Sequence, residues 1–203
     1  MLQMPYEYRK LTFHEREEIV RYRRDRGYPL HAPPHPFREA GYYLITAAIF
    51  EHALIIASPE RRTEFEVLLL ETMKKIQAEV IAWVILLNHY HILIDVESLN
   101  LVSEALKFLH GNTSRQWNLQ DNLTGKRRVW YKFSDRFMRS EKQLHQIFNF
   151  IHHNPIKHDY TDDINDWPWS SFKLYEESQG RDWLREQLKS NTPPEELGRG
   201  WDD

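Results

Sequence analysis

The sequence predicts an α+β fold built on a ferredoxin-like antiparallel β-sheet in the order βαββαβ, with one additional helix and with N- and C-terminal extensions. From residue 41 onward, strand-like and helix-like stretches alternate with clear boundaries. Crossover helices in this order cover one face of the sheet, which leaves the opposite face for the additional helix. At 203 residues and 41% apolar composition, the chain has the size of one domain with one sizeable core.

The first half of the domain is predicted to be a strand, a helix and a hairpin. Residues 42–50 form a strongly β-forming run, and Ser58 followed by Pro59 is a helix start signal. The next apolar positions then recur at helical spacing: Phe65, Leu68, Leu69, Met73 and Ile76. Residues 80–87 are apolar on both alternating faces, which is typical of a central strand. Residues 89–96 follow a tight connection at Asn88, so the two strands should form a hairpin.

The second half is predicted to be a helix, a strand and the additional helix. Helical spacing marks the first helix, which ends near residues 118–124 and has the apolar positions Val102, Ala105, Leu106, Leu109 and Trp117. Residues 129–137 then form a predicted strand. Ser140 and Gln143 form a capping box that opens the additional helix, and Pro155 is expected to end it.

Charge divides the chain into unlike parts. Residues 104–157 contain ten Lys/Arg against four Asp/Glu, whereas residues 158–203 contain five against twelve. This asymmetry predicts a basic working surface joined to an acidic tail, although two solvated faces of opposite sign would look the same. With the prolines at 33, 34 and 36, we expect a basic, Pro-rich arm at 1–40, a central domain at 41–160 and an acidic extension at 161–203.

Composition restricts the chemistry and the compartment. The chain has no cysteine, so a metal site must use histidine, carboxylate or amide ligands. No run approaches the roughly 20 apolar residues of a membrane span. We expect a cytoplasmic protein without a membrane partner.

A histidine pair is the first candidate site. On a strand, alternate side chains share a face, so His89 and His91 project together while Tyr90 projects the other way. Two imidazoles in this arrangement could share one divalent cation. Alternatively, they are ordinary hydrogen-bonded strand residues.

The additional helix contributes the second part of this site. Phe150 and Asn154 are four residues apart and lie on one helix face. The amide oxygen of Asn154 could complete a metal site on the sheet face that this helix covers. The alternative reading is a C-terminal cap for Asn154 and simple packing for Phe150.

Four motifs, in this order and spacing, resemble those of REP-associated tyrosine transposases, a single-tyrosine family of the HUH endonuclease superfamily. They are Asn-His-Tyr-His at 88–91, Trp-Tyr-Lys-Phe-Ser-Asp-Arg at 130–136, Phe-Ile-His-His-Asn-Pro-Ile-Lys at 150–157 and Asp-Trp-Pro-Trp-Ser-Ser-Phe at 166–172. The resemblance covers roughly residues 1–172. It implies that His89, His91 and Asn154 hold a divalent metal, Mg²⁺ or Mn²⁺, although two imidazoles would also accept Zn²⁺ or Ni²⁺. It also implies that the protein cleaves and rejoins single-stranded DNA through a 5'-phosphotyrosine link.

The sequence departs from the family pattern at the nucleophile, because Phe150 occupies the position of the tyrosine. A phenyl ring cannot attack phosphorus, so whether the chain is an enzyme is left open. Phe150 could be a natural or an engineered change, or another group such as Tyr160 or a metal-bound water could act instead. We expect a cleavage-deficient transposase-like protein. The alternatives are a domesticated regulatory protein that binds DNA or RNA hairpins and a metal-dependent phosphodiesterase.

Basic residues interleaved with aromatic residues predict the nucleic-acid surface. The candidates for phosphate contacts are Arg115, Lys126, Arg127, Arg128, Lys132, Arg136, Arg139 and Lys157. The alternative is a solvated basic edge. By resemblance, the partner is a single-stranded DNA hairpin such as a REP-like palindrome. A homodimer is possible, since some relatives build their active sites between two chains.

Overall fold

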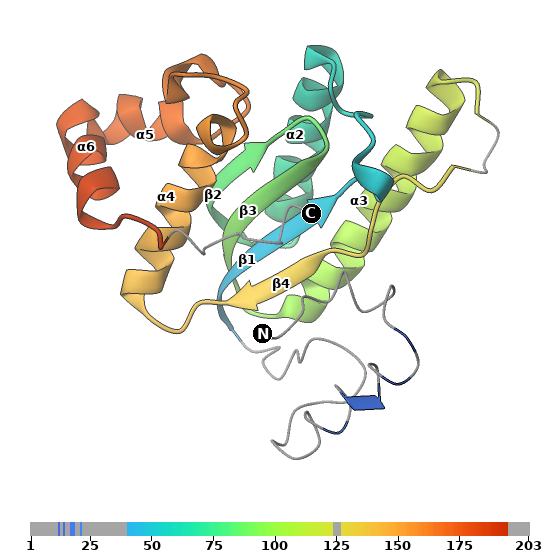
Figure 1. Ribbon diagram of the computed structural model, residues 1–203, viewed down its shortest axis with the longest axis horizontal. Coiled ribbons are helices and arrows are strands. Elements are labelled where there is room, and N and C mark those ends of the chain that lie inside the picture. The colour runs from blue at the N-terminus through green and yellow to red at the C-terminus, as the bar shows by residue number, and fades with distance from the viewer. Residues whose placement is uncertain are drawn as a thin grey trace.

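The computed structural model describes residues 40–123 and 127–194, together with a few positions in the first 39. Within these ranges the strands form one antiparallel sheet of four strands in the order β2-β3-β1-β4 (Figure 1). The predicted α+β fold is therefore confirmed, with strands and helices in the expected βαββαβ sequence followed by a further helix.

The elements have well-defined bounds. The strands are β1 (Gly41–Ala48), β2 (Glu79–Ile85), β3 (His89–Val96) and β4 (Ser134–Phe137). The α-helices in the described ranges are α2 (Pro59–Lys75), α3 (Leu99–Gln120), α4 (Glu141–Lys157), α5 (Phe172–Gln179) and α6 (Arg181–Ser190). Short 3-10 turns occur at Phe50–His52 and Ile164–Asp166. The Ser58 side chain accepts the N–H of Arg61 and so caps α2, as the sequence predicts.

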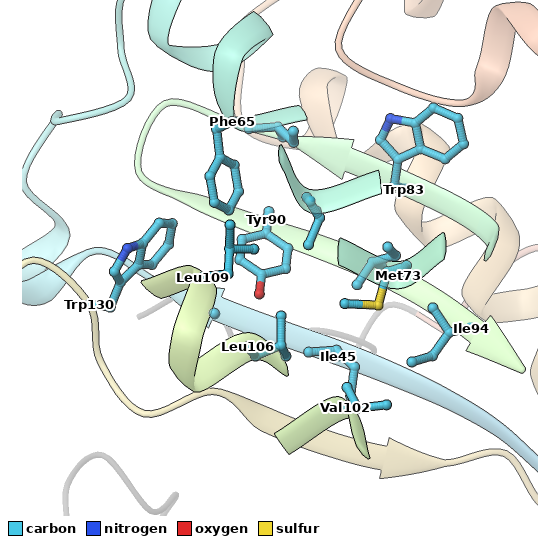
Figure 2. Close-up of a cluster of buried hydrophobic side chains, with 14 of the residues drawn as sticks. Ile45, Phe65, Met73, Trp83, Tyr90, Ile94, Val102, Leu106, Leu109 and Trp130 are labelled. Carbon is cyan, nitrogen blue, oxygen red and sulfur yellow. The ribbon is translucent and has the colours of Figure 1, made fainter. Parts of the chain in front are cut away.

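The sheet separates two hydrophobic layers (Figure 1). On one face, α2 and α3 cover the inner side chains of the strands. Figure 2 shows side chains from β1, β3, α2 and α3 meeting around Tyr90, with Phe65 and Trp130 beside it. The rings of Phe65 and Tyr90 lie 5.2 Å apart, and those of Phe65 and Trp130 lie 5.1 Å apart. This aromatic core anchors the back of β3.

On the other face, α4 packs against β2 and β3, and the chain after it continues this second layer. Residues 169–171 run antiparallel along β2, since Ile85 N–H donates to Trp169 C=O (2.9 Å) and Ser171 N–H donates to Trp83 C=O (3.1 Å). These bonds cover the outer edge of β2, which would otherwise expose unpaired backbone groups.

The predicted strand at 129–137 is shorter than expected, because only Ser134–Phe137 pairs continuously with β1. Trp130 still forms a bridge with Ile49, while Ser134 pairs with Thr46. The three-residue advance from Thr46 to Ile49 therefore lies opposite a four-residue advance from Trp130 to Ser134. This extra residue interrupts the ladder in the manner of a β-bulge.

The prediction that Pro155 ends the additional helix is wrong, because α4 continues through Pro155 to Lys157. The proline lacks one backbone donor and crowds the carbonyl of residue 151, but it lies only two positions before the end of the helix. The turn remains closed, since His158 N–H donates to Asn154 C=O (3.1 Å) and Tyr160 N–H donates to Pro155 C=O (3.0 Å). Asn154 consequently lies inside the helix and does not cap it.

Some expectations concern parts that the structure leaves untested. The arm predicted at 1–40 falls almost wholly outside the described residues. The division at residue 160 stays a prediction, and residues 164–190 pack on α4 and β2 as the 3-10 turn at Ile164–Asp166, α5 and α6. Among the described residues, no helix has the length and apolar character needed to cross a membrane.

Two buried histidines make the stability of the fold sensitive to pH. His110 shares a hydrogen bond with the Tyr90 hydroxyl (3.0 Å), and His152 shares one with Ser171 Oγ (2.6 Å). Burial lowers the pKa of both histidines to about 3. Below the ordinary histidine pKa of about 6.5, the unfolded chain therefore binds protons that the folded protein does not bind.

We predict that stability is complete above about pH 6.5 and falls towards pH 3, by about 1.4 kcal/mol per pH unit for each histidine. Urea unfolding at pH 7, 6 and 5 measures the slope. His152→Gln should reduce this slope, whereas His153→Gln, at an exposed position of the same helix, should leave it unchanged. Equal slopes for the wild type and His152→Gln would contradict the prediction.

Candidate functional site

The two strand histidines lie together under α4. His89 and His91 project from β3 towards the α4 layer, and their ring centroids are 5.1 Å apart. Only 1% of His89 and none of His91 is exposed. Tyr90 points to the opposite core, as the strand period requires. The predicted placement of the pair on the α4 face is thus what the structure shows.

Each histidine is oriented by a neighbour through its Nδ1 atom. His89 Nδ1 lies 2.8 Å from Asn88 Oδ1, and His91 Nδ1 lies 2.7 Å from Thr46 Oγ1. A carbonyl-type oxygen can only accept, so the Asn88 contact requires a proton on His89 Nδ1. In the neutral imidazole, the lone pair is then on Nε2, the nitrogen available to a cation. Asn88 and Thr46 are therefore positioning residues.

One face of α4 lies along the histidine pair. The Phe150 ring is 5.1 Å from the His91 ring, and the His158 ring is 5.0 Å from the His89 ring. Phe150, Asn154 and His158 follow one another at intervals of four residues. Because such residues share a helix face, Asn154 lies between the two flanking contacts and faces the imidazoles.

Asn154 is fully buried, and neither its Oδ1 nor its Nδ2 atom has a hydrogen-bond partner within the described part of the chain. A buried amide in this condition costs free energy, so it calls for a partner beyond the described residues, such as a bound ion. Two imidazoles and one amide oxygen are suitable ligands for a divalent cation. The residues present thus fit a metal ion. The described ranges contain no group of three His, Cys, Asp or Glu side chains arranged to hold one, so the amide is essential to this arrangement.

His158 is a site residue that sequence reasoning missed. It follows the last residue of α4, and its ring also stacks on Tyr160 at 5.6 Å. The ring of Tyr160 stacks in turn on Trp167, again at 5.6 Å. The chain therefore does fold back after Pro155. The His158 ring contacts both Tyr160 and His89. The spacing 150, 154, 158 could have indicated this residue if the helix had been extended past the proline.

Phe150 presents only carbon to the site. Its exposed fraction is 4%, and Lys157 Nζ lies 5.1 Å from its ring centroid. The ring lies against His91, but phenylalanine has no hydroxyl to offer there.

The predicted DNA-contact residues fall into separate groups. Arg136 pairs across the sheet with Leu44 and so lies on the α4 face, where Lys157 ends the helix. Arg115 and Arg139 are exposed elsewhere, on α3 and before α4. Lys126 lies outside the described residues.

The remaining basic candidates line a groove of about 680 Å³ between α3 and residues 127–135, which we call the α3 groove. Its basic residues are Lys107, Arg127, Arg128 and Lys132. Arg127 also forms an ion pair with Asp121 (2.7 Å). The pKa of the Asp121 carboxyl is lowered mainly by its hydrogen bond with Arg61 and further by Arg127. Arg127 thus has a structural role, whereas Arg128 and Lys132 are exposed.

Comparison with known proteins places the chain in a family. The family model described as "Transposase IS200 like" matches residues 40–154, a range that covers more than half of the chain and contains His89, His91 and Asn154. The chain belongs to the IS200-like transposase family.

One relative and one solved structure are similar to this chain. A protein of Haemophilus influenzae whose name assigns it as a REP-associated tyrosine transposase is 25% identical over 146 residues, which cover 67% of this chain and 82% of the relative. A solved structure of a REP-associated tyrosine transposase bound to a REP hairpin aligns with a TM-score of 0.57 and 18% identity. That alignment covers 70% of this chain and 83% of the other, and it supports the fold. The resemblance predicted from the sequence is confirmed.

We predict that Asn154→Leu stabilises the metal-free protein by about 1–2 kcal/mol, because it removes a buried amide whose atoms lack partners. Asn149→Leu is the matched control on α4, since the Asn149 Nδ2 atom donates to the carbonyls of Gln187 (2.9 Å) and Asn191 (2.8 Å). That variant should be destabilised. Urea unfolding with a chelator present measures the stability of both variants. Equal destabilisation of the two variants would argue against a buried Asn154 amide without hydrogen-bond partners.

Proposed function

We propose that this transposase-family protein binds single-stranded and hairpin DNA at the His89–His91 site, with a divalent cation held by His89, His91 and Asn154. As the chain stands, it does not cut DNA through residue 150. The observation that carries the proposal is the convergence, on one side of the sheet, of two oriented imidazoles and a buried amide that has no hydrogen-bond partner among the described residues. Mg²⁺ and Mn²⁺ suit phosphate chemistry best.

Charge near the site favours a phosphate-containing ligand. Lys157 and Arg136 lie on the same face of the sheet as the histidines. The related structure contains a REP hairpin, which makes a DNA hairpin the first ligand to test. Positive side chains around an unpaired strand provide contacts to phosphates independently of sequence.

The chemistry follows from the groups present. A bound divalent ion would supply Lewis-acid polarisation of a scissile phosphate. His89 and His91 would hold the ion through Nε2, and Asn88 and Thr46 would keep the rings oriented. Lys157 would hold a phosphate oxygen close to the ring at position 150. In a tyrosine-bearing form, a hydroxyl on that ring would attack phosphorus, form the 5'-phosphotyrosine link and release the 3'-oxygen.

A regulatory hairpin-binding protein is the second candidate. Phe150 favours it, because the phenyl ring is packed against His91 and retains the shape of the site without its nucleophile. Such a protein would bind and release hairpins without changing them.

We predict that Phe150→Tyr forms a covalent adduct with a labelled single-stranded hairpin in Mn²⁺, detected by denaturing gel, whereas the wild type forms none. Phe148→Tyr is the control, since Phe148 lies on the same helix but contacts His152 and Tyr175. An adduct with neither variant would favour the regulatory protein. Cleavage by the wild type without an adduct would favour hydrolysis by water.

The metal site has its own test. We expect one Mn²⁺ ion per chain in calorimetric titration, and binding should be lost in His91→Ala. Asn88→Ala should weaken binding about 10- to 100-fold, because it removes a partner that orients His89. His153→Ala, at an exposed position of α4, should have no effect. Unchanged affinity in His91→Ala would overturn the assignment of the ligands.

A further inference from the structure

The described fold does not explain why residue 111 is a glycine. Glycine in a helix interior is less stable than alanine, and Gly111 lies in the middle of α3. Gly41 and Gly180 have positive φ angles of 143° and 87°, which explain glycine at those positions. A Cβ on Gly111 would meet no described atom within 4 Å. The described residues therefore offer no interaction that offsets the destabilisation of α3 by this glycine.

Gly111 lines the α3 groove opposite a basic wall. Four cationic side chains line the groove, against two carboxylates, Glu104 and Asp135. The exposed side chains of Arg128 and Lys132 belong to the wall that faces α3. A cationic groove with an open glycine surface is complementary to a polyanion that approaches the helix closely.

The floor of the α3 groove is rigid. The rings of His110 and Trp130 stack at 4.4 Å with 16° between their planes, and both residues line the groove. Trp130 Nε1 donates to Thr113 Oγ1 (3.0 Å), and His110 shares its hydrogen bond with Tyr90. The floor is thus tied to the residue that separates His89 from His91 on β3.

The α3 groove and the candidate metal site lie on opposite faces of the sheet, and the end of β1 connects them. The Arg128 guanidinium lies over the rings of Phe50 (4.8 Å) and Tyr131 (5.3 Å). Tyr131 N–H donates to Ala48 C=O (2.9 Å), and Ala48 pairs with His89 across the sheet. A strand leaving the site in this direction would pass the stacked cluster and enter the groove.

We propose that the α3 groove receives the sugar–phosphate backbone of the DNA whose neighbouring segment occupies the His89–His91 site. Gly111 admits the backbone against α3, and Arg128 and Lys132 contact its phosphates. This inference rests on the proposed DNA binding and adds a defined path for the strand. It assigns to Gly111 and the α3 wall a role that the basic residues alone did not reveal.

The first test uses the full chain and a fluorescent DNA hairpin with an unpaired flank, read by anisotropy. Gly111→Ala should raise Tm by about 2–4 °C, since alanine favours the helix. It should nevertheless weaken DNA binding roughly fivefold, because the added methyl group keeps the DNA backbone away from α3. Gly111→Gln, which meets open space in the described fold, should weaken binding further. Asn112→Ala, at the next exposed position of α3, should leave affinity unchanged.

The second test measures how the affinity for DNA depends on salt concentration. Lys132→Gln should reduce the slope of log affinity against log salt by about one, whereas Lys142→Gln on α4 should not. If the wild type binds the hairpin but the Gly111 variants bind equally well, the groove assignment is overturned and the proposed function stands. If the wild type binds no hairpin, the proposed function itself fails.

Discussion

The geometry of the candidate metal site depends on the packing of one face of α4 against β3. Residues at intervals of four advance about 6 Å along a helix, so Phe150 and His158 are about 12 Å apart along α4. Alternate strand residues advance about 6.7 Å, the separation of His89 and His91 along β3. Phe150 contacts one imidazole and His158 contacts the other, so the two residues bracket the histidine pair. Asn154 then falls opposite the middle of the pair, with an amide that has no partner in the described chain.

This packing requires a β3 that does not move, and the opposite core supplies that rigidity. Tyr90 is fully buried among the rings of Phe65, His110 and Trp130 (Figure 2). Burial raises the pKa of its hydroxyl, so the hydroxyl remains protonated and shares a hydrogen bond with His110. One strand therefore presents different side chains on its two faces: two histidines towards α4 and an aromatic anchor towards α2 and α3.

Local sequence patterns predicted much of the fold and of the candidate site. The bounds of β3, the cap at Ser58 and the shared face of Phe150 and Asn154 all follow from strand and helix periods. The errors arose where tertiary contacts decide. Pro155 lies in a final helical turn closed by later residues, and the extra residue before Ser134 becomes visible only against β1. His158 was missed because it follows Pro155, where the helix was expected to end. The α3 groove could not be predicted, because it depends on segments distant in sequence meeting in space.

The central claim is that His89, His91 and Asn154 surround one divalent cation. Crystals of the full chain soaked in Mn²⁺ and measured at the manganese absorption edge test it most directly. We expect one anomalous peak within about 2.0–2.3 Å of the Nε2 atoms of both histidines and of the Asn154 Oδ1 atom. A fully occupied peak elsewhere, or a site at this position without Asn154 among the ligands, would contradict the account.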